Sequence, residues 1–293
     1  MQVAVLGAGT MGRGIAQVAA TAGHDVAVRD VDRERVDDGI AGIRATLREG
    51  VERGKVTESE RAATLDRIAG TTDLADAVAD ADLVVEAVPE DRDLKREVFR
   101  EVEAAASDDA VLATNTSSIP VTGIASVLDR PERAVGLHFF NPVHLMGLVE
   151  VVVGERTSEA TRTAAESFVD DVDKTAVVVR DSPGFASSRL GVALGTEAMR
   201  MVEEGVADPR DIDAAMELGY NHPMGPLELT DVVGLDVRLD VLEHLREELG
   251  ERFRPPQVLK RKVRAGKLGR KTGEGFYVWE DDEVVGVGGG AGR

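Results

Sequence analysis

One histidine and one glutamate in the middle of the chain are the residues best suited to catalysis. His138 ends the apolar run of VGLHFF, and Glu150 interrupts the apolar run LVEVVV twelve residues later. A carboxylate inside an apolar strand must be paired or raised in pKa, because burial disfavours its charged form. If adjacent strands bring Glu150 behind the imidazole, it fixes the tautomer and raises the basicity of the other nitrogen, as a general base requires. Taken alone, His138 is equally consistent with a hydrogen-bonded core histidine.

The N-terminal segment carries a pattern suited to binding a dinucleotide. GAGTMG, residues 7–12, matches G-x-G-x-x-G, follows an apolar strand pattern and opens a helical pattern. Gly7 permits a tight turn, Gly9 lets the backbone approach a pyrophosphate, and Gly12 allows close packing of helix on strand. The helix N-terminus also offers unpaired N–H groups to phosphates. A structural glycine turn is the alternative, but the strand-turn-helix context favours a dinucleotide.

An acidic residue indicates which dinucleotide is bound. Asp30 closes the second predicted strand, 18 residues after Gly12. A carboxylate there accepts hydrogen bonds from both ribose hydroxyls and repels a 2′-phosphate, which favours NAD over NADP. Arg29 and Arg33 flank Asp30 and soften that preference.

A polar cluster, NTSS at residues 115–118, follows another predicted strand. In an open α/β sheet the ligand crevice lies beyond the carboxyl ends of the strands, so this amide and these hydroxyls face a ligand. The alternative is an N-cap for a helix after Ser118. With the glycine motif, His138 and Glu150, the cluster places polar groups at one edge of one sheet.

The elements that must position these residues alternate between strands and helices. Further strand patterns lie in HDVAVRD, at residues 80–91, 110–118, 133–140 and 148–154, and in KTAVVV. Residues 31–69 carry a long helical pattern broken around Gly50 and Gly54, and residues 158–172 carry another helical pattern. This alternation predicts an α/β fold whose N-terminal domain is a Rossmann-type, parallel, doubly wound sheet.

The C-terminal part shows helical patterns instead, at residues 184–205, 209–218, 226–249 and 256–266. Ser-Pro-Gly at 182–184 is the strongest break between the two parts. We therefore predict an NAD-binding domain over residues 1–182 and an all-α domain over 183–280. The acidic, glycine-rich residues 281–293 are predicted to be a flexible, frayed end.

Composition excludes several function classes. The chain has 293 residues, 43% of them apolar, with 54 acidic and 35 basic side chains and a net charge of −19. Such a surface repels nucleic acid and anionic membranes. No apolar run approaches the roughly 20 residues that span a bilayer and no signal peptide is recognisable, so a cytoplasmic location is expected.

The cysteine and lysine counts add two inferences. The absence of cysteine excludes disulfides, thiolate metal sites and a cysteine nucleophile, and no metal site is predicted. Redox chemistry must then come from a bound cofactor. Only seven of the 35 basic residues are lysine, and this acidic, arginine-rich profile resembles proteins of salt-loving cells.

At this point the sequence resembles the L-3-hydroxyacyl-CoA dehydrogenase family, and within it the 3-hydroxybutyryl-CoA dehydrogenases. The resemblance covers residues 1 to about 278 and rests on motifs in family order: VLGAGTMGRGIAQ, VRD, DLVVEAVPE, ATNTSSI, GLHFFNPVHLMGLVEV, DSPGFASSRL, NHPMGPLELTDVVGLD and GRKTGEGFY. The family joins an N-terminal Rossmann domain to a helical C-terminal domain.

The resemblance implies roles for individual residues. His138 is the catalytic base, Glu150 its partner, and Ser117 bonds the substrate's 3-oxygen beside the nicotinamide. Contacts to coenzyme A are implied for Thr46 and Arg53; an arginine there also suits a phosphate. Contacts to NAD are implied for Gly7, Gly9, Thr10, Met11, Gly12, Asp30, Glu90, Lys95, Asn115, Asn141 and Lys271.

The sequence departs from the family pattern at two positions. PGFASSR places Ser188 where the family has an active-site asparagine, and a serine donates a hydrogen bond over a shorter reach. Gly147 stands where the family usually has lysine. Both departures bear on chain-length preference and rate more than on the reaction.

The implied reaction is a hydride transfer with an acyl-CoA thioester as substrate. His138 takes the hydroxyl proton of an L-3-hydroxyacyl-CoA while hydride passes from carbon 3 to NAD, giving the 3-oxoacyl-CoA. By resemblance, the helical domain closes over the thioester and forms a homodimer. Three alternatives remain: a related two-domain dehydrogenase of a free hydroxy acid or sugar acid, a catalytically decayed NAD-binding regulatory protein, and a structural protein that reuses a dehydrogenase fold.

Overall fold

The structure is a computed structural model that describes residues 1–289. The chain forms two compact units, Met1–Phe185 and a second unit that begins at Ala186. Phe185 belongs to the first unit because it packs against Val121 and Val152. The sequence places this division near residue 182, at the Ser-Pro-Gly break.

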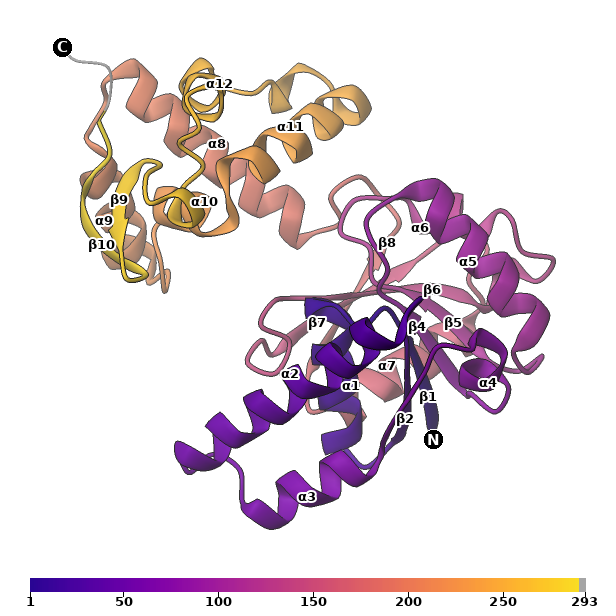
Figure 1. Ribbon diagram of the computed structural model, residues 1–293. Coiled ribbons are helices and arrows are strands. Elements are labelled where there is room, and N and C mark those ends of the chain that lie inside the picture. The colour runs from indigo at the N-terminus through magenta and orange to yellow at the C-terminus, as the bar shows by residue number, and fades with distance from the viewer. Residues whose placement is uncertain (290–293) are drawn as a thin grey trace. The chain divides into compact units, whose positions relative to one another are not determined.

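The first unit is built on an eight-stranded sheet of order β3-β2-β1-β4-β5-β6-β7-β8 (Figure 1). β1 pairs in parallel with both β2 and β4, so the strand order reverses beside β1. This reversal is the topological switch point at which doubly wound sheets bind ligands. The strands are β1 (Gln2–Leu6), β2 (Asp25–Arg29), β3 (Ile68–Thr71), β4 (Leu83–Glu86), β5 (Val111–Thr114), β6 (Ala134–Phe139), β7 (Leu148–Val153) and β8 (Thr175–Arg180).

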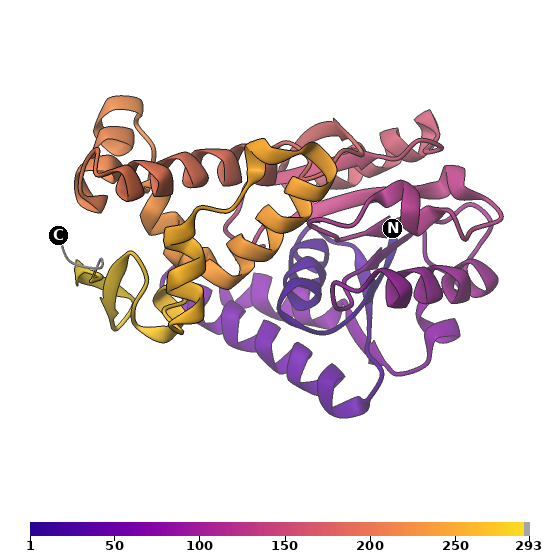
Figure 2. The ribbon, with the colours of Figure 1, turned by 90° about the horizontal axis from the view of Figure 1, so that it is seen from above.

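Helices cover both faces of this sheet (Figures 1 and 2). Because successive strand residues face opposite sides, Val3 and Val5 enter one apolar core while Ala4 and Leu6 enter the other. The first core is closed by α1 (Thr10–Thr21), α2 (Arg33–Glu52), α3 (Glu58–Asp66) and α7 (Glu159–Asp171). The second is closed by α4 (Leu74–Val78), α5 (Arg92–Ala105) and α6 (Val121–Ala125), and a short 3-10 turn, η1 (Pro131–Arg133), precedes β6.

Two details of the sheet differ from the sequence prediction. β3 lies in a segment predicted as helical up to residue 69, because four residues are too few to show a strand period. The sheet is also not wholly parallel, since β7 runs antiparallel to β6. Only residues 140–147 join these two strands, whereas a parallel crossover needs a dozen or more residues.

The second unit is helical, as predicted, with one addition. Its helices are α8 (Ser187–Glu204), α9 (Pro209–Tyr220), α10 (Pro226–Val233), α11 (Leu235–Leu249) and α12 (Gln257–Arg264), with 3-10 turns η2 (Glu251–Phe253) and η3 (Arg270–Thr272). A hairpin of β9 (Tyr277–Glu280) and β10 (Glu283–Val287) follows. The prediction of a frayed end from residue 281 is therefore wrong for β10, while residues 290–293 lie outside the described residues.

Buried carboxylates explain why the hairpin is ordered. Asp231 of α10 accepts hydrogen bonds from the backbone N–H groups of Phe276 and Tyr277 and from the Trp279 indole, at 2.8, 2.9 and 3.0 Å. Asp213 accepts a bond from the Tyr277 hydroxyl at 2.7 Å. Burial raises the pKa of both aspartates, because it disfavours the charged carboxylates. The hydrogen bonds act in the opposite direction and offset part of this desolvation cost.

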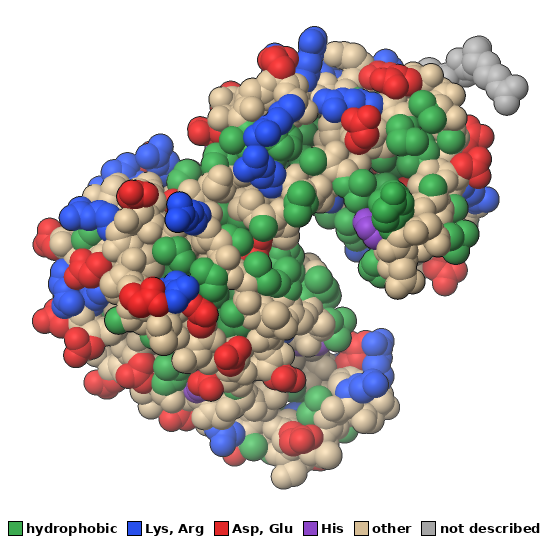
Figure 3. All heavy atoms as spheres, turned by 180° about the vertical axis from the view of Figure 1, so that it is seen from behind, with side chains coloured by type: hydrophobic (Ala, Val, Ile, Leu, Met, Phe, Trp, Pro, Cys, Tyr) green, Lys and Arg blue, Asp and Glu red, His purple; other side chains and the backbone are tan. Residues whose placement is uncertain are grey.

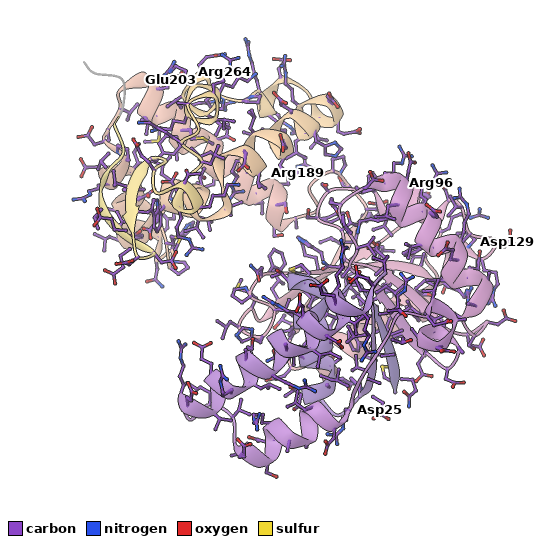
Figure 4. The ribbon with its side chains drawn as sticks, viewed as in Figure 1. Asp25, Arg96, Asp129, Arg189, Glu203 and Arg264 are labelled. Atoms are coloured by element: carbon purple, nitrogen blue, oxygen red, sulfur yellow. The ribbon has the colours of Figure 1, made fainter. Side chains whose placement is uncertain are left out.

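The surface mixes charges of both signs. Acidic and basic side chains are both scattered over the face in Figure 3, among hydrophobic and other side chains. Figure 4 shows Asp25, Arg96 and Asp129 at the periphery of the first unit. Among residues 1–289, no helix is both long and apolar enough to cross a membrane.

Candidate active site

His138 and Glu150 form a buried pair. They are direct partners in the antiparallel register of β6 and β7, and Nδ1 of His138 lies 2.8 Å from Oε2 of Glu150. The two residues are 7% and 1% exposed, respectively. The hydrogen bond occupies Nδ1, which leaves Nε2 as the ring nitrogen for proton exchange. The structure thus brings together the two side chains that the sequence singled out.

Two phenylalanine rings lie near the imidazole of His138. The Phe140 ring centroid lies 4.5 Å from that of His138, and the Phe185 centroid lies 5.7 Å from it. Phe139 is 2% exposed and belongs to the sheet core, as predicted for at least one of the two adjacent phenylalanines. Sequence reasoning missed Phe185, whose signal was only its place after the Pro-Gly break.

The glycine loop has the geometry that a pyrophosphate site needs. Gly7 has φ of +105°, and a Cβ there would lie 2.6 Å from the Ala87 carbonyl oxygen. A Cβ on Gly12 would lie 1.7 Å from the Gly7 carbonyl oxygen, whereas a Cβ on Gly9 would meet nothing within 4 Å. Two glycines are therefore required by the fold, and the third borders open space beside the N-terminus of α1.

Asp30 and the glycine loop line one cavity of about 680 Å³. The Asp30 carboxylate accepts hydrogen bonds from the N–H groups of Ala8 at 2.8 Å and Val31 at 2.7 Å, which hold it beside the loop. Thr10 and Met11, in the first turn of α1, line the same cavity. Ala87, Val88 and Leu94 supply an apolar wall. An acid, open backbone and an apolar wall fit an adenine dinucleotide.

Glu90 organises the NTSS segment. Its Oε1 accepts hydrogen bonds from the Thr116 hydroxyl at 2.6 Å and from the N–H groups of Ser117 and Ser118 at 3.0 and 3.1 Å. Burial raises the pKa of Glu90, but the charge of Lys95 and these hydrogen bonds outweigh it and lower the pKa overall. The alternative role of NTSS as an N-cap is wrong, because α6 begins at Val121 after Pro120 and has no side-chain cap.

A buried ion pair lies behind Glu90. Lys95 is 0% exposed, and its Nζ lies 2.8 Å from Oε1 of Glu86 and 3.4 Å from Oε2 of Glu90. Glu86, which sequence reasoning missed, also accepts bonds from the Thr114 hydroxyl and the Val88 N–H, both at 2.7 Å. The Lys95 ammonium contacts Glu86 and Glu90 and is fully buried, so the contact with NAD that the resemblance implies for Lys95 stays a prediction.

The two asparagines lie at the carboxyl end of the sheet. Oδ1 of Asn115 accepts a hydrogen bond from the Phe139 N–H at 2.9 Å, which joins the ends of β5 and β6. Asn141 is exposed and lies two residues after Phe139, the last residue of β6. Both positions are compatible with contact to a ligand at this edge.

Thr46 and Arg53 line a second cavity of about 700 Å³ in the first unit. The Thr46 hydroxyl donates to the Gly42 carbonyl at 3.1 Å, and the exposed Arg53 guanidinium lies 2.5 Å from Glu49. The cavity wall also contains Lys55 and Lys174. The lining also contains three acids, Glu49, Asp171 and Asp173, so its cations balance its acids in number. Cations of this kind bind phosphate groups.

Lys174 holds the segment that follows His138. Its Nζ donates to the carbonyls of Val143 at 2.7 Å and Met146 at 2.6 Å. Burial lowers the pKa of Lys174 and also that of His144, which lies on the same cavity wall. A Cβ on Gly147 would meet nothing within 4 Å, so nothing in the fold requires glycine there.

The two remaining predicted site residues belong to the second unit. Ser188 is the second residue of α8, and Lys271 lies in η3 with its Nζ 2.6 Å from the Asp236 carboxylate. Their parts in the site, as substrate donor and cofactor contact, stay predictions.

Comparisons with known proteins identify the family. Residues 2–182 match the model of the 3-hydroxyacyl-CoA dehydrogenase NAD binding domain, and residues 184–279 match that of its C-terminal domain. A probable 3-hydroxybutyryl-CoA dehydrogenase of Deinococcus radiodurans is 46% identical, over 94% of this chain and 99% of the relative. The 3-hydroxybutyryl-CoA dehydrogenase of Bradyrhizobium diazoefficiens is 45% identical, over 97% of each chain. The crystal structure of (S)-3-hydroxybutyryl-CoA dehydrogenase from Ralstonia eutropha superposes with a TM-score of 0.92 at 40% identity, covering 96% of this chain and 99% of that one. The chain therefore belongs to the 3-hydroxyacyl-CoA dehydrogenase family.

Proposed function

We propose that the chain catalyses the reversible, NAD-dependent oxidation of an L-3-hydroxyacyl-CoA to the 3-oxoacyl-CoA, with 3-hydroxybutyryl-CoA as its preferred substrate. The observation that carries this proposal is the buried pair of His138 and Glu150, 2.8 Å apart at the carboxyl end of β6. The four-carbon preference is supported by relatives that are named 3-hydroxybutyryl-CoA dehydrogenases.

His138 is the proposed proton acceptor. Its Nε2 takes the proton of the substrate's 3-hydroxyl, and Glu150 holds the ring in the required tautomer and stabilises the imidazolium that forms. NAD, when bound, supplies the acceptor for the hydride that leaves carbon 3. In the reverse direction the imidazolium returns the proton to the 3-oxygen.

Ser117 and Ser188 are the proposed donors to the substrate oxygen. Glu90 accepts hydrogen bonds from the N–H group of Ser117 at 3.0 Å and from its hydroxyl at 3.4 Å, so the backbone of Ser117 is anchored and the hydroxyl must turn away from Glu90 to reach the substrate. A donor aimed at the 3-oxygen stabilises the negative charge that develops during hydride transfer. Phe140 lies against the imidazole and limits its access to water.

The second cavity is the proposed site for coenzyme A. Arg53, Lys55 and Lys174 attract its phosphates, and Thr46 supplies a hydroxyl. Arg53 is paired with Glu49, and Lys174 is bonded to the Val143 and Met146 carbonyls. The thioester is therefore favoured over a free hydroxy acid or sugar acid by the named relatives. The intact pair of His138 and Glu150 argues against a decayed or structural protein.

We also propose a homodimer formed through the second unit. Leu218 and Tyr220 at the end of α9 are 88% and 75% exposed, which is unusual for large apolar side chains that are close in sequence. A cytoplasmic location and a salt-rich habitat remain predictions from the sequence.

The test is reduction of acetoacetyl-CoA by the purified chain, followed through NADH absorbance in low and high salt, with free acetoacetate in parallel. Turnover of the thioester alone is expected. Replacing His138 by alanine should abolish turnover while NADH still binds. Absence of thioester turnover in both salts would refute the proposal, and loss of NADH binding in the variant would make His138 structural.

Replacing Ser188 by asparagine tests the departure in α8. Because asparagine reaches farther, a gain in turnover would show that serine limits this site. A fall would show that the surrounding residues have adapted to serine.

A further inference from the structure

Arg13 lies where two cavities of the first unit meet. It is an exposed residue in α1, directly after Gly12, and α1 packs against α2 (Figure 1). Arg13 lines the cofactor cavity, and it also lines a third cavity of about 430 Å³ over α2. Thr46, which lines the cavity proposed for coenzyme A, borders this third cavity as well. The Arg13 side chain is therefore within the surface that leads from one ligand to the other.

A glycine within α2 makes room for the Arg13 side chain. A Cβ on Gly42 would lie 2.7 Å from Nη1 of Arg13, 3.0 Å from its Cδ and 3.3 Å from its Cζ. Gly42 is not among the glycines with positive φ, so the backbone conformation does not require glycine there. Inside a helix, glycine is less favourable than any other residue except proline. The contact with Arg13 is thus the reason that the structure gives for glycine at this position.

The charge of Arg13 is not neutralised by the chain. Among residues 1–289, its guanidinium has no hydrogen-bond or ion-pair partner. The neighbouring charges on α2 are paired with one another, since Arg48 lies 3.8 Å from Glu52 and Arg53 lies 2.5 Å from Glu49. Arg13 therefore supplies an uncompensated positive charge beside this group, together with free N–H donors.

We propose that Arg13 is a specificity-determining residue that binds a phosphate in the nucleotide part of coenzyme A, and so favours coenzyme A thioesters over thioesters whose carrier has no nucleotide. The proposal rests on the function and the coenzyme A cavity proposed above. A guanidinium binds phosphate through two parallel N–H donors. Arg13 also lines the cofactor cavity, so the cofactor's pyrophosphate is another source of phosphate. The position of its guanidinium over Gly42, on the side of Thr46, favours coenzyme A.

The experiment compares two thioesters in the wild type, Arg13→Ala and Arg44→Ala. The thioesters are acetoacetyl-CoA and acetoacetyl-N-acetylcysteamine, which carries no nucleotide. Arg44 is a matched control, because it is an exposed arginine of α2 that has no ion-pair partner among residues 1–289 and lines none of the three cavities. Both variants remove one positive charge. Binding of NADH is measured separately, by the fluorescence of the reduced nicotinamide.

Arg13→Ala is expected to raise KM for acetoacetyl-CoA about three- to tenfold, because an exposed charge-assisted contact is lost. It should leave kcat/KM for the N-acetylcysteamine thioester and the Kd of NADH unchanged. Arg44→Ala should change none of these quantities. Added salt should narrow the difference in KM between the wild type and Arg13→Ala, because it screens an exposed charge.

Gly42→Ala tests the seat of the guanidinium without removing its charge. The added Cβ meets the flexible end of Arg13, which must move aside, while alanine favours the helix. This variant should melt no lower than the wild type and yet raise KM for acetoacetyl-CoA about two- to fivefold, because the guanidinium is misplaced. In the Arg13→Ala background the same substitution should raise KM no further.

Three results would overturn the proposal: equal losses with the two thioesters, a loss confined to NADH binding, or an Arg13→Ala variant that behaves like Arg44→Ala. A loss confined to NADH would assign Arg13 to the cofactor's pyrophosphate. Failure of the wild type to turn over either thioester would refute the proposed function instead. Calorimetric titration with coenzyme A alone still tests Arg13 in that case, and an unchanged Kd in Arg13→Ala would overturn its role.

Discussion

Replacing Lys95 by methionine tests how much the buried ion pair of Lys95 and Glu86 stabilises the first unit. Lys95 is 0% exposed and Glu86 is 1% exposed. Methionine is close to lysine in volume, but it removes the cation that pairs with Glu86 among residues 1–289. Glu86 keeps its bonds to Thr114 and Val88, yet a carboxylate without its cation remains buried. Breaking a buried pair in this way costs about 3–5 kcal/mol. We expect the free energy of unfolding of the first unit to fall by that amount at neutral pH.

The assay is urea denaturation followed by far-ultraviolet circular dichroism. The only tryptophan, Trp279, lies in the second unit, so its fluorescence reports that unit separately. The control is the double variant Glu86→Gln/Lys95→Met, which removes both charges and should recover most of the loss. A loss below about 1 kcal/mol in the single variant, or a double variant no more stable than the single one, would contradict this account of the pair.

Three further predictions concern the site. Glu150→Gln should lower kcat by about ten- to a hundredfold, since a charge-assisted bond to His138 is worth about 1.5–3 kcal/mol; an unchanged rate in stopped-flow turnover would remove Glu150 from the mechanism. Gly9→Ala should melt like the wild type but bind NADH more weakly. Gly12→Ala should lose stability as well, because a Cβ at Gly12 meets the Gly7 carbonyl and a Cβ at Gly9 meets nothing. Equal melting temperatures of the two variants would contradict this. The pKa of Glu90 is lower in the folded state than in the unfolded state, so the ionised carboxylate stabilises the fold above the unfolded pKa, and this stabilisation is lost as pH falls through the folded pKa. The difference in unfolding free energy between the wild type and Glu90→Gln should therefore shrink in acid. A difference that stays constant across the titration would refute this role of Glu90.

The residues with a local signal were predictable from the sequence. The glycine loop is a motif of six consecutive residues, and the structure gives a steric reason for glycine at Gly7 and Gly12 while Gly9 borders open space. The pair of His138 and Glu150 was predictable because two polar residues interrupted apolar strands that lie near each other in the chain. The antiparallel register that places the two residues opposite each other was not predictable. It depends on the ends of β6 and β7 and on the length of the segment between them, which the sequence leaves uncertain.

Features that depend on tertiary contacts escaped the sequence. The resemblance implies that Lys95 contacts NAD, and only the fold shows that its ammonium is buried against Glu86 and Glu90. β10 lies in the segment predicted as a frayed end, because acidic and glycine residues are depleted in strands. Asp231, on another helix, supplies the bonds that order the hairpin.

The direct pairing of His138 with Glu150 across two strands has a consequence for preorganisation. A backbone ladder sets the separation of their Cα atoms, so the imidazole is already oriented when the first unit folds. Little reorganisation is then left for the moment of proton transfer, and a preorganised environment is a major source of catalytic rate. Variants that disturb the ladder, at positions such as Val149 or Leu137, should therefore lose rate without losing ligand contacts.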